Sequence, residues 1–202
     1  MKVYTAEQAY EDYKDLKKED VQALQEWMRK QYHLPKISEL KIIFFLHASY
    51  YKIESAKTYI ENYFTLRGSW LEFSQNRDIN SEPMRHTIKL GLITDLPIRT
   101  KHNHLIVYSR LIDFSLDHFD ALRQIKYFDM TVACLFRKLG LSDGQVAIMD
   151  MEGCTFGHLL RINLMDLKRH TYYVQEALPV RLKAMHYINI SPVADKLLAM
   201  ET

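Results

Sequence analysis

Apolar and polar positions repeat with two different periods along this chain, and the change of period falls near residue 71. Up to that point apolar residues recur every three to four positions, which is the spacing of amphipathic helices. The pattern predicts four helices, over Thr5–Leu16, Asp20–Gln31, a segment capped by Ser38, and Ile53–Trp70. The third helix contains Ile42–Leu46, which is apolar on every side, so we expect it to be buried.

Short apolar runs replace this pattern in the second half of the chain. They predict strands over Leu105–Ile112, Val146–Met151 and Ala184–Ile190. Residues 72–102 show neither period and contain two prolines, so they predict an irregular linker with one short helix near Met84–Leu90.

Both intervals between the predicted strands have helical spacing. The first helix is expected over Asp117–Leu139. The second begins after Asn163, which can accept from the free N–H groups of the first turn, and it ends before Pro179. A helix between two strands is the crossover that parallel pairing requires. The sequence therefore predicts an α/β fold, with an N-terminal all-helical lobe followed by a mainly parallel sheet flanked by helices.

Composition narrows the functional classes. The chain is 48% hydrophobic and 26% charged, which is ordinary for a globular protein, and its net charge of +2 does not indicate a nucleic-acid partner. Cys134 and Cys154 lie in apolar stretches, so we expect buried, reduced thiols. The N-terminus lacks the apolar stretch of a secretory signal, and no apolar run approaches the ~20 residues of a membrane span. We expect a cytoplasmic protein.

Catalytic and metal sites have little support in the sequence. Gly153 and Gly157 follow a predicted strand, but their spacing is not that of a dinucleotide-binding or phosphate-binding loop. His102 and His104 form a close pair without a third ligand at metal-binding spacing. We find no nucleophile signature, and we expect neither enzyme activity, nor a cofactor, nor a metal.

Two segments resemble a known family. AIMDMEGCTFGHLLRIN at residues 147–163 and QEALPVRLKAMHYINIS at residues 175–191 are similar to the CRAL-TRIO lipid-binding domain, the family of the alpha-tocopherol transfer protein and the cellular retinaldehyde-binding protein. The shared features are a strand ending D-x-x-G, an aromatic residue three positions later, a helix, and P-V-R-x-K leading into a strand that ends I-N.

The resemblance implies a division of the chain and an incomplete end. Residues 1–72 would be the helical lobe that precedes the domain, and residues 73–202 would be the CRAL-TRIO domain without its C-terminal part. Only residues 193–202 follow Pro192, and they predict a short helix. We expect a shortened variant that associates through an exposed sheet edge or holds lipid weakly.

Apolar side chains from several predicted elements converge between residues 127 and 180, and methionine and tyrosine are frequent among them. Such side chains suit a cavity that adapts to an apolar guest, although an ordinary core is the alternative. His158 and His170 are either satisfied polar groups in this wall or contacts to the polar end of a ligand. The resemblance favours a cavity, and the ligand contacts it implies are Tyr127, Thr131, Met149, Phe156, Ile162, His170, Tyr173, Val174 and Val180.

Arg181 and Lys183 alternate at the start of the last predicted strand. They are either a solvated strand edge or, as the resemblance implies, a phosphoinositide site, with Arg181 binding phosphate by its fork and Lys183 as a point charge. Phe45–Ser49 stands where the family often has F-L-R-A-R, so two basic positions are missing there.

The resemblance implies cytosolic binding of a hydrophobic small molecule and its transfer between membranes. Retinoids, tocopherols, carotenoids and phospholipids are all candidates. An anionic phosphoinositide membrane surface would be a transient partner at the pocket rim, with phosphatidylinositol bisphosphate as the headgroup. The alternative is a cargo-free regulatory or adaptor protein with the same fold.

Overall fold

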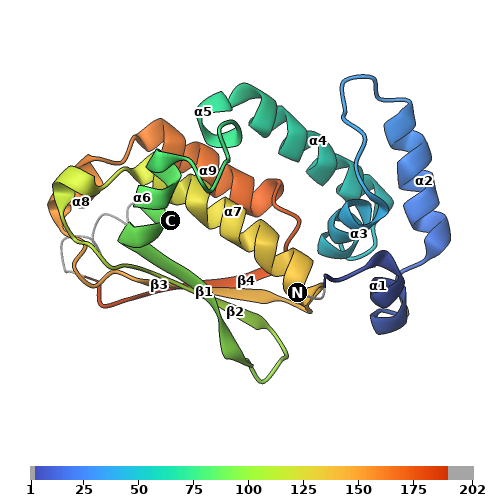
Figure 1. The fold of residues 1–202 in the computed structure, drawn as a ribbon. Coiled ribbons are helices and arrows are strands. Elements are labelled where there is room, and N and C mark those ends of the chain that lie inside the picture. Colours follow the sequence, from blue (N-terminus) through green and yellow to red (C-terminus); the bar gives the residue numbers. More distant parts are fainter. Residues whose placement is uncertain (1–2, 191–202) are drawn as a thin grey trace.

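The computed structural model describes residues 3–190, which form an all-helical N-terminal part and a four-stranded sheet with helices packed on it. In Figure 1 the N-terminal helices lie at one end of the sheet, and the later helices lie along one of its faces. The predicted α/β class is confirmed. The helices of the N-terminal part are α1 (Ala6–Asp12), α2 (Lys18–Arg29), α3 (Glu39–Ala48), α4 (Ile53–Ser69) and α5 (Leu71–Ser74).

Side-chain caps set where two of these helices begin. At α1 the amide of Gln8 donates to Thr5 Oγ1 at 3.3 Å, and the amide of Thr5 donates to Gln8 Oε1 at 3.0 Å, which is a reciprocal capping box. At α3 the amide of Lys41 donates to Ser38 Oγ at 3.3 Å, so Ser38 is the predicted cap. Every residue from Ile42 to Ala48 is buried, which confirms the expected burial of this apolar segment.

The sheet has the strand order β1-β2-β3-β4. Strands β2, β3 and β4 are parallel, and helices α7 and α9 connect them in turn, so both predicted crossovers are confirmed. The elements of this part are α6 (Glu82–Leu90), β1 (Gly91–Arg99), β2 (Leu105–Leu111), the 3₁₀ turn η1 (Leu116–His118), α7 (Ala121–Leu139), β3 (Gln145–Asp150), α8 (Phe156–Leu160), α9 (Leu164–Glu176) and β4 (Leu182–Ile188).

The linker expected over residues 72–102 is wrong for its second half, where β1 pairs antiparallel with β2. Pro97 concealed this strand, because proline removes a ladder hydrogen bond and argues against a central strand. The structure accommodates it in two ways. β1 is an edge strand of the described sheet, and Pro97 lies where the register shifts between Asp95 and Arg99.

Helix α7 begins later than the sequence predicts, at Ala121 rather than Asp117. The reason is a local cap, since the amide of Arg123 donates to the Asp120 side chain at 3.0 Å. The residues just before it form the separate turn η1. The expected burial of Cys134 in α7 is also wrong, because this side chain is exposed.

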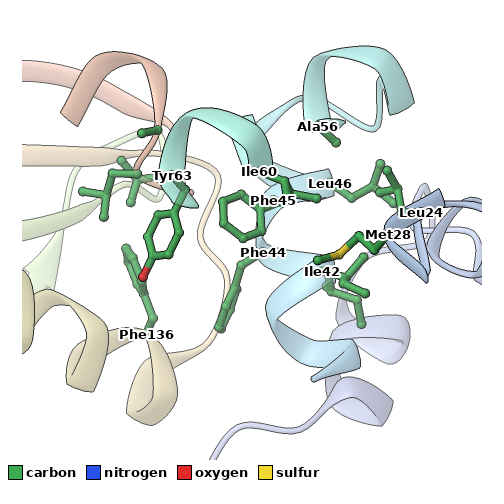
Figure 2. Close-up of a cluster of buried hydrophobic side chains, with 14 of the residues drawn as sticks. Leu24, Met28, Ile42, Phe44, Phe45, Leu46, Ala56, Ile60, Tyr63 and Phe136 are labelled. Atoms are coloured by element: carbon green, nitrogen blue, oxygen red, sulfur yellow. The ribbon is translucent and has the colours of Figure 1, made fainter. Parts of the chain in front are cut away.

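The helical lobe and the sheet-containing part share one core. Figure 2 shows Phe44, Phe45 and Tyr63 of the lobe packed together with Phe136 of α7, and all four belong to one buried cluster. The ring centroids of Phe44 and Phe136 are 5.8 Å apart. Because this apolar contact is continuous, the lobe holds one end of α7 in place relative to the sheet.

A buried ionic cluster joins the same two parts. Asp129 of α7 accepts from Arg67 of α4 at 3.0 Å and from Arg77 at 2.5 Å. Tyr173 of α9 donates its hydroxyl to the same carboxylate at 2.6 Å. Asp129 is only 4% exposed, so the two arginines supply the charge compensation that a buried carboxylate requires.

The sheet ends at β4 in the described part of the chain. The short helix expected over residues 193–202 lies outside the described residues. The expectations of a shortened domain and of weak lipid retention depend on that segment, and they stay predictions.

Candidate ligand-binding site

A cavity of about 260 Å³ lies between the sheet and the helices that cover it. Its floor is one face of β2 and β3, because side chains on a strand alternate between the two faces of a sheet. Val107 pairs with Ala147 and Ser109 pairs with Met149, and all four residues line the cavity. Three of these four side chains are apolar, and the methionine is flexible enough to adapt to a bound molecule.

Helices α7 and α9 supply the opposite wall through stripes at helical spacing. Gln124, Phe128 and Val132 are four residues apart along α7, so they lie on one face of the helix. Phe128 contacts α9 directly, since its ring centroid lies 6.2 Å from that of His170 in an edge-on arrangement. The α9 residues of the wall are Leu167, His170 and Val174.

The structure brings five of the predicted ligand contacts together at this cavity. They come from the floor, from the segment after α8, from α9 and from the entry to β4. Their roles as ligand contacts remain predictions. The five lining residues are Met149, Ile162, His170, Val174 and Val180.

The other four predicted contacts lie elsewhere. Phe156 opens α8 and is 50% exposed. Tyr173 is 1% exposed and is held in the core by its hydrogen bond to Asp129. Tyr127 and Thr131 are half-buried on α7, one position away from the stripe that lines the cavity. The sequence carried a signal for that stripe, because the i, i+4, i+8 spacing of the actual lining residues is readable without a structure.

Few polar side chains interrupt the apolar wall. The Nε2 atoms of Gln124, His158 and His170 are buried and make no hydrogen bond with the described residues. Burial lowers the pKa of His170 to about 4 and lowers that of His158 as well, so both imidazoles are neutral near pH 7. Burial also raises the pKa of the half-buried Cys154 thiol, which makes a poor nucleophile of it.

Arg110 lines the cavity, and a carboxylate already compensates its positive charge. Arg110 Nη2 lies 3.2 Å from Glu152 Oε2, and Arg110 Nε donates to the carbonyl of Leu111 at 3.2 Å. The carboxylate of Asp150 accepts from the Tyr108 hydroxyl at 2.6 Å, and it is hydrogen-bonded on its other oxygen too. The polar atoms at the cavity can therefore orient a bound molecule, but they do not form an acid–base or nucleophilic set.

Arg181 and Lys183, the predicted basic pair, both contact Tyr50 of the helical lobe. Lys183 Nζ donates to the Tyr50 hydroxyl at 2.7 Å, and the Arg181 guanidinium lies 4.3 Å from the centroid of the same ring. Arg181 Nε also donates to the carbonyl of His47 at 2.7 Å. Arg181 and Lys183 are two positions apart, and side chains at that spacing on a strand point to the same face, so both cations can reach Tyr50. The pairing of β3 with β4 passes from Leu182 to Ala184 and skips Lys183.

Metal ligation has no support in the described residues, where no three histidine, cysteine or carboxylate side chains come together in a group that could hold an ion. Among the same residues, none of the helices combines the length and the apolarity needed to cross a bilayer. The cavity is thus lined mostly by apolar side chains, and two basic side chains lie against the lobe.

Comparison with known proteins agrees with this geometry. The chain is 24% identical over 175 residues to the human and the Pongo abelii proteins named alpha-tocopherol transfer protein-like, covering 84% of this chain and 50% of each relative. The mouse protein of the same name is 22% identical over 173 residues. The chain thus spans about half the length of the curated relatives it matches.

Two family models match consecutive parts of the chain. One, described as "Pinta-like, UBA domain", matches residues 13–84, which include most of the helical lobe. The other, the CRAL/TRIO domain, matches residues 92–200 and thus more than half of the chain, including the sheet and the cavity. The chain belongs to the CRAL/TRIO family.

Proposed function

We propose that this protein encloses a hydrophobic small molecule and carries it between membranes. Membership of the CRAL/TRIO family implies hydrophobic ligand binding or transfer in general, and most members are lipid binders without enzyme activity. The observation that supports a carrier for this chain is the apolar cavity of about 260 Å³ between the sheet and α7. Pockets of this kind, apolar with a few polar groups, are typical of sites for small apolar ligands.

The proposal gives the two parts of the chain different roles. Residues 73–202 hold the cargo, and residues 1–72 form a lobe that supports α7 through the shared core. The protein works in the cytosol and visits membranes transiently. The cargo class includes retinoids, tocopherols, carotenoids and phospholipids, and the name of the relatives favours tocopherol-like molecules.

Arg181 and Lys183 are the proposed contact with an anionic membrane. Their shared position over Tyr50 supports this role, because it keeps both cations at the surface of the lobe. A phosphoinositide phosphate would bind the guanidinium as a fork and the ammonium as a point charge. His47 and Ser49 stand where further basic residues would strengthen such a site, so we expect a weaker headgroup contact than four cations would give.

Mass spectrometry of an organic extract of the purified chain tests the carrier function. We expect lipid in a stoichiometric amount, and chain that takes up added cargo after delipidation. A cargo-free adaptor would yield no lipid and would take up none.

Sedimentation velocity on the same sample tests the expected self-association, for which the outer edge of β4 is the proposed contact. A species of constant size at all concentrations would contradict it.

A further inference from the structure

The polar atoms of the cavity are few, and two of them need a partner. Gln124 Nε2 and His170 Nε2 are buried, belong to residues that line the cavity, and make no hydrogen bond with the described part of the chain. A buried polar group without a hydrogen-bond partner destabilises a protein, so such groups are rare and often mark a functional site.

His158 has a different explanation. Its Nδ1 accepts from the amide of Thr155 at 3.1 Å, as part of the capping box that begins α8, so its ring is fixed by the turn it closes. Its imidazole also interacts with the backbone of Phe114, which partly opposes the lowering of its pKa by burial. This histidine serves the local structure, which leaves Gln124 and His170 as the unexplained pair.

Gln124 and His170 come from two helices, α7 and α9, and both line the cavity. His170 of α9 packs edge-on against Phe128 of α7, with ring centroids 6.2 Å apart. Gln124 precedes Phe128 by four residues, so it lies one turn away on the same face of α7. Two hydrogen-bonding side chains thus flank one aromatic ring in an otherwise apolar lining.

We propose that Gln124 and His170 bind the single polar group of a neutral, single-chain lipid, with its hydrocarbon against the apolar floor. This deepens the carrier function proposed above and rests on it. An alcohol, aldehyde, ketone or ester oxygen accepts from the amide N–H of Gln124 and from Nε2–H of His170, and an alcohol can instead donate to Nε2 in the other tautomer.

Charge and size both restrict the cargo to this class. Burial keeps His170 neutral, and Arg110 is paired with Glu152, so the described lining residues offer no free cation to a carboxylate. A fatty acid would bury an uncompensated charge. The volume of about 260 Å³ falls below the range of roughly 300–1,000 Å³ that is usual for ligand pockets. This leaves room for one chain rather than the two of a phospholipid.

Four fluorescent or quenching probes test the inference on the full chain. Retinol, retinaldehyde and retinoic acid share one hydrocarbon and differ only at the polar end, and diphenylhexatriene is a rod-shaped hydrocarbon without one. We expect the wild-type chain to bind the alcohol and the aldehyde about tenfold more tightly than the acid. The acid must bury its charge without compensation or bind in its protonated form, and either cost lowers its affinity.

Variants separate the polar contact from the general fit. His170→Leu and Gln124→Leu should each weaken the alcohol and the aldehyde about tenfold and leave diphenylhexatriene unchanged. His170→Gln keeps a hydrogen-bonding group near the position of Nε2 and should recover part of the loss. Val174→Ala is the matched control in the same wall, and it should weaken all four probes together.

The outcomes distinguish this inference from the carrier function itself. If the chain binds none of the four probes, the cavity takes no lipid and both fail. If it binds diphenylhexatriene but treats the alcohol, the aldehyde and the acid alike, the carrier function stands and the neutral polar contact is refuted. An unchanged alcohol affinity in both leucine variants, with thermal unfolding as in wild type, overturns the assignment of these two residues.

Discussion

At the scale of single residues, the lobe contains a histidine that is buried without charge. His47 lies in α3 with its ring edge-on to Tyr13 at 4.8 Å and to Tyr51 at 5.9 Å. Its Nε2 is buried and makes no hydrogen bond with the described residues. Burial, and then the nearby charge of Arg181, lower the pKa of His47 from 6.5 to about 3. The fold thus depends on this ring staying neutral.

The first prediction is a loss of stability in mild acid. Because the pKa of His47 is lower in the folded chain, the unfolded chain binds more protons between about pH 6.5 and pH 3. Stability should therefore fall as the pH drops through this window, by up to about 1.4 kcal/mol per pH unit for this residue. His47→Phe should reduce the slope measured by urea unfolding between pH 6 and pH 4.

An exposed histidine gives the control for this experiment. His102 lies in the turn before β2 and is exposed, so His102→Gln should leave the slope as in wild type. His158 and His170, which are also kept neutral by burial, would retain part of the slope in His47→Phe. Equal slopes in wild type and His47→Phe would show that the lobe tolerates the charge.

The second prediction concerns the buried carboxylate that joins the lobe to α7. Burial opposes the ionisation of Asp129, yet Arg67 and Arg77 hold its pKa below the usual range. Asp129→Asn removes the compensating charge from both arginines, and breaking a buried ion pair in this way destabilises by about 3–5 kcal/mol. The free energy of unfolding in urea measures this loss.

A surface pair provides the contrast. Glu152 lies 3.2 Å from Arg110 with its side chain 57% exposed, so Glu152→Gln should change stability by only about 0–1 kcal/mol. Similar losses in both variants would mean that the Asp129 cluster is no more important than an exposed ion pair.

At the scale of elements, the turn between β3 and α8 depends on one glycine. Gly153 has φ +75°, and a Cβ atom there would lie 2.3 Å from the ring of Phe114. The left-handed backbone alone costs a non-glycine residue roughly 1–2 kcal/mol. The third prediction is that Gly153→Ala destabilises the chain by at least this amount, because the contact with Phe114 adds to the backbone cost, and thermal unfolding measures the loss.

Another glycine should respond in the opposite direction. Gly68 lies in the last turn of α4, and a Cβ atom there meets nothing within 4 Å. Gly68→Ala should stabilise the chain by about 0.4–1 kcal/mol, because alanine lowers the entropy of the unfolded chain and favours helix. A stabilising effect of both substitutions would contradict the strain assigned to Gly153.

Sequence reasoning succeeded where the hydrophobic period was undisturbed. The spacing across α7 and α9 and the apolar runs of β2, β3 and β4 predicted these elements to within a few residues. It failed at β1, where Pro97 masks a strand whose edge position tolerates it. The same limit applies at the site. The register of the sequence cannot distinguish a residue that lines the cavity from one that is exposed, as Phe156 is. Nor can it distinguish a lining residue from a core residue such as Tyr173, which donates a hydrogen bond to Asp129.

At the scale of the whole molecule, the lobe and the sheet-containing part form one packed body, joined in the described residues by at least two separate contacts. The shared apolar core and the Asp129 cluster hold α4 against α7 and α9. The second contact lies at the entry to β4, where Arg181 donates to the carbonyl of His47 and stacks on Tyr50. Arg181 is therefore part of the junction, and its removal would change the fold as well as the surface charge.

Lys183 offers the cleaner test of the membrane-facing role, because its side chain is exposed and its ammonium donates to the Tyr50 hydroxyl rather than to the backbone of the lobe. The fourth prediction is that Lys183→Ala weakens binding to vesicles containing phosphatidylinositol bisphosphate about fivefold and makes the remaining binding less sensitive to salt. A cation near an anionic membrane contributes about 1 kcal/mol. Co-sedimentation with vesicles over a range of salt concentrations measures both effects.

Two further variants, Lys89→Ala and Arg181→Lys, distinguish a general effect of net charge from a specific contact with the headgroup in the same assay. Lys89 is exposed in α6, away from the junction, and Lys89→Ala should leave vesicle binding nearly unchanged. Arg181→Lys keeps the charge but loses the planar fork, so it should weaken binding to the bisphosphate more than binding to phosphatidylserine. If Lys183→Ala and Lys89→Ala weaken vesicle binding equally, the binding depends on net charge alone. Arg181 and Lys183 would then be a solvated strand edge rather than a headgroup site. Cargo affinity in the absence of vesicles should stay the same in all three variants, because Arg181, Lys183 and Lys89 lie outside the cavity lining and Arg181→Lys keeps a positive charge at the lobe.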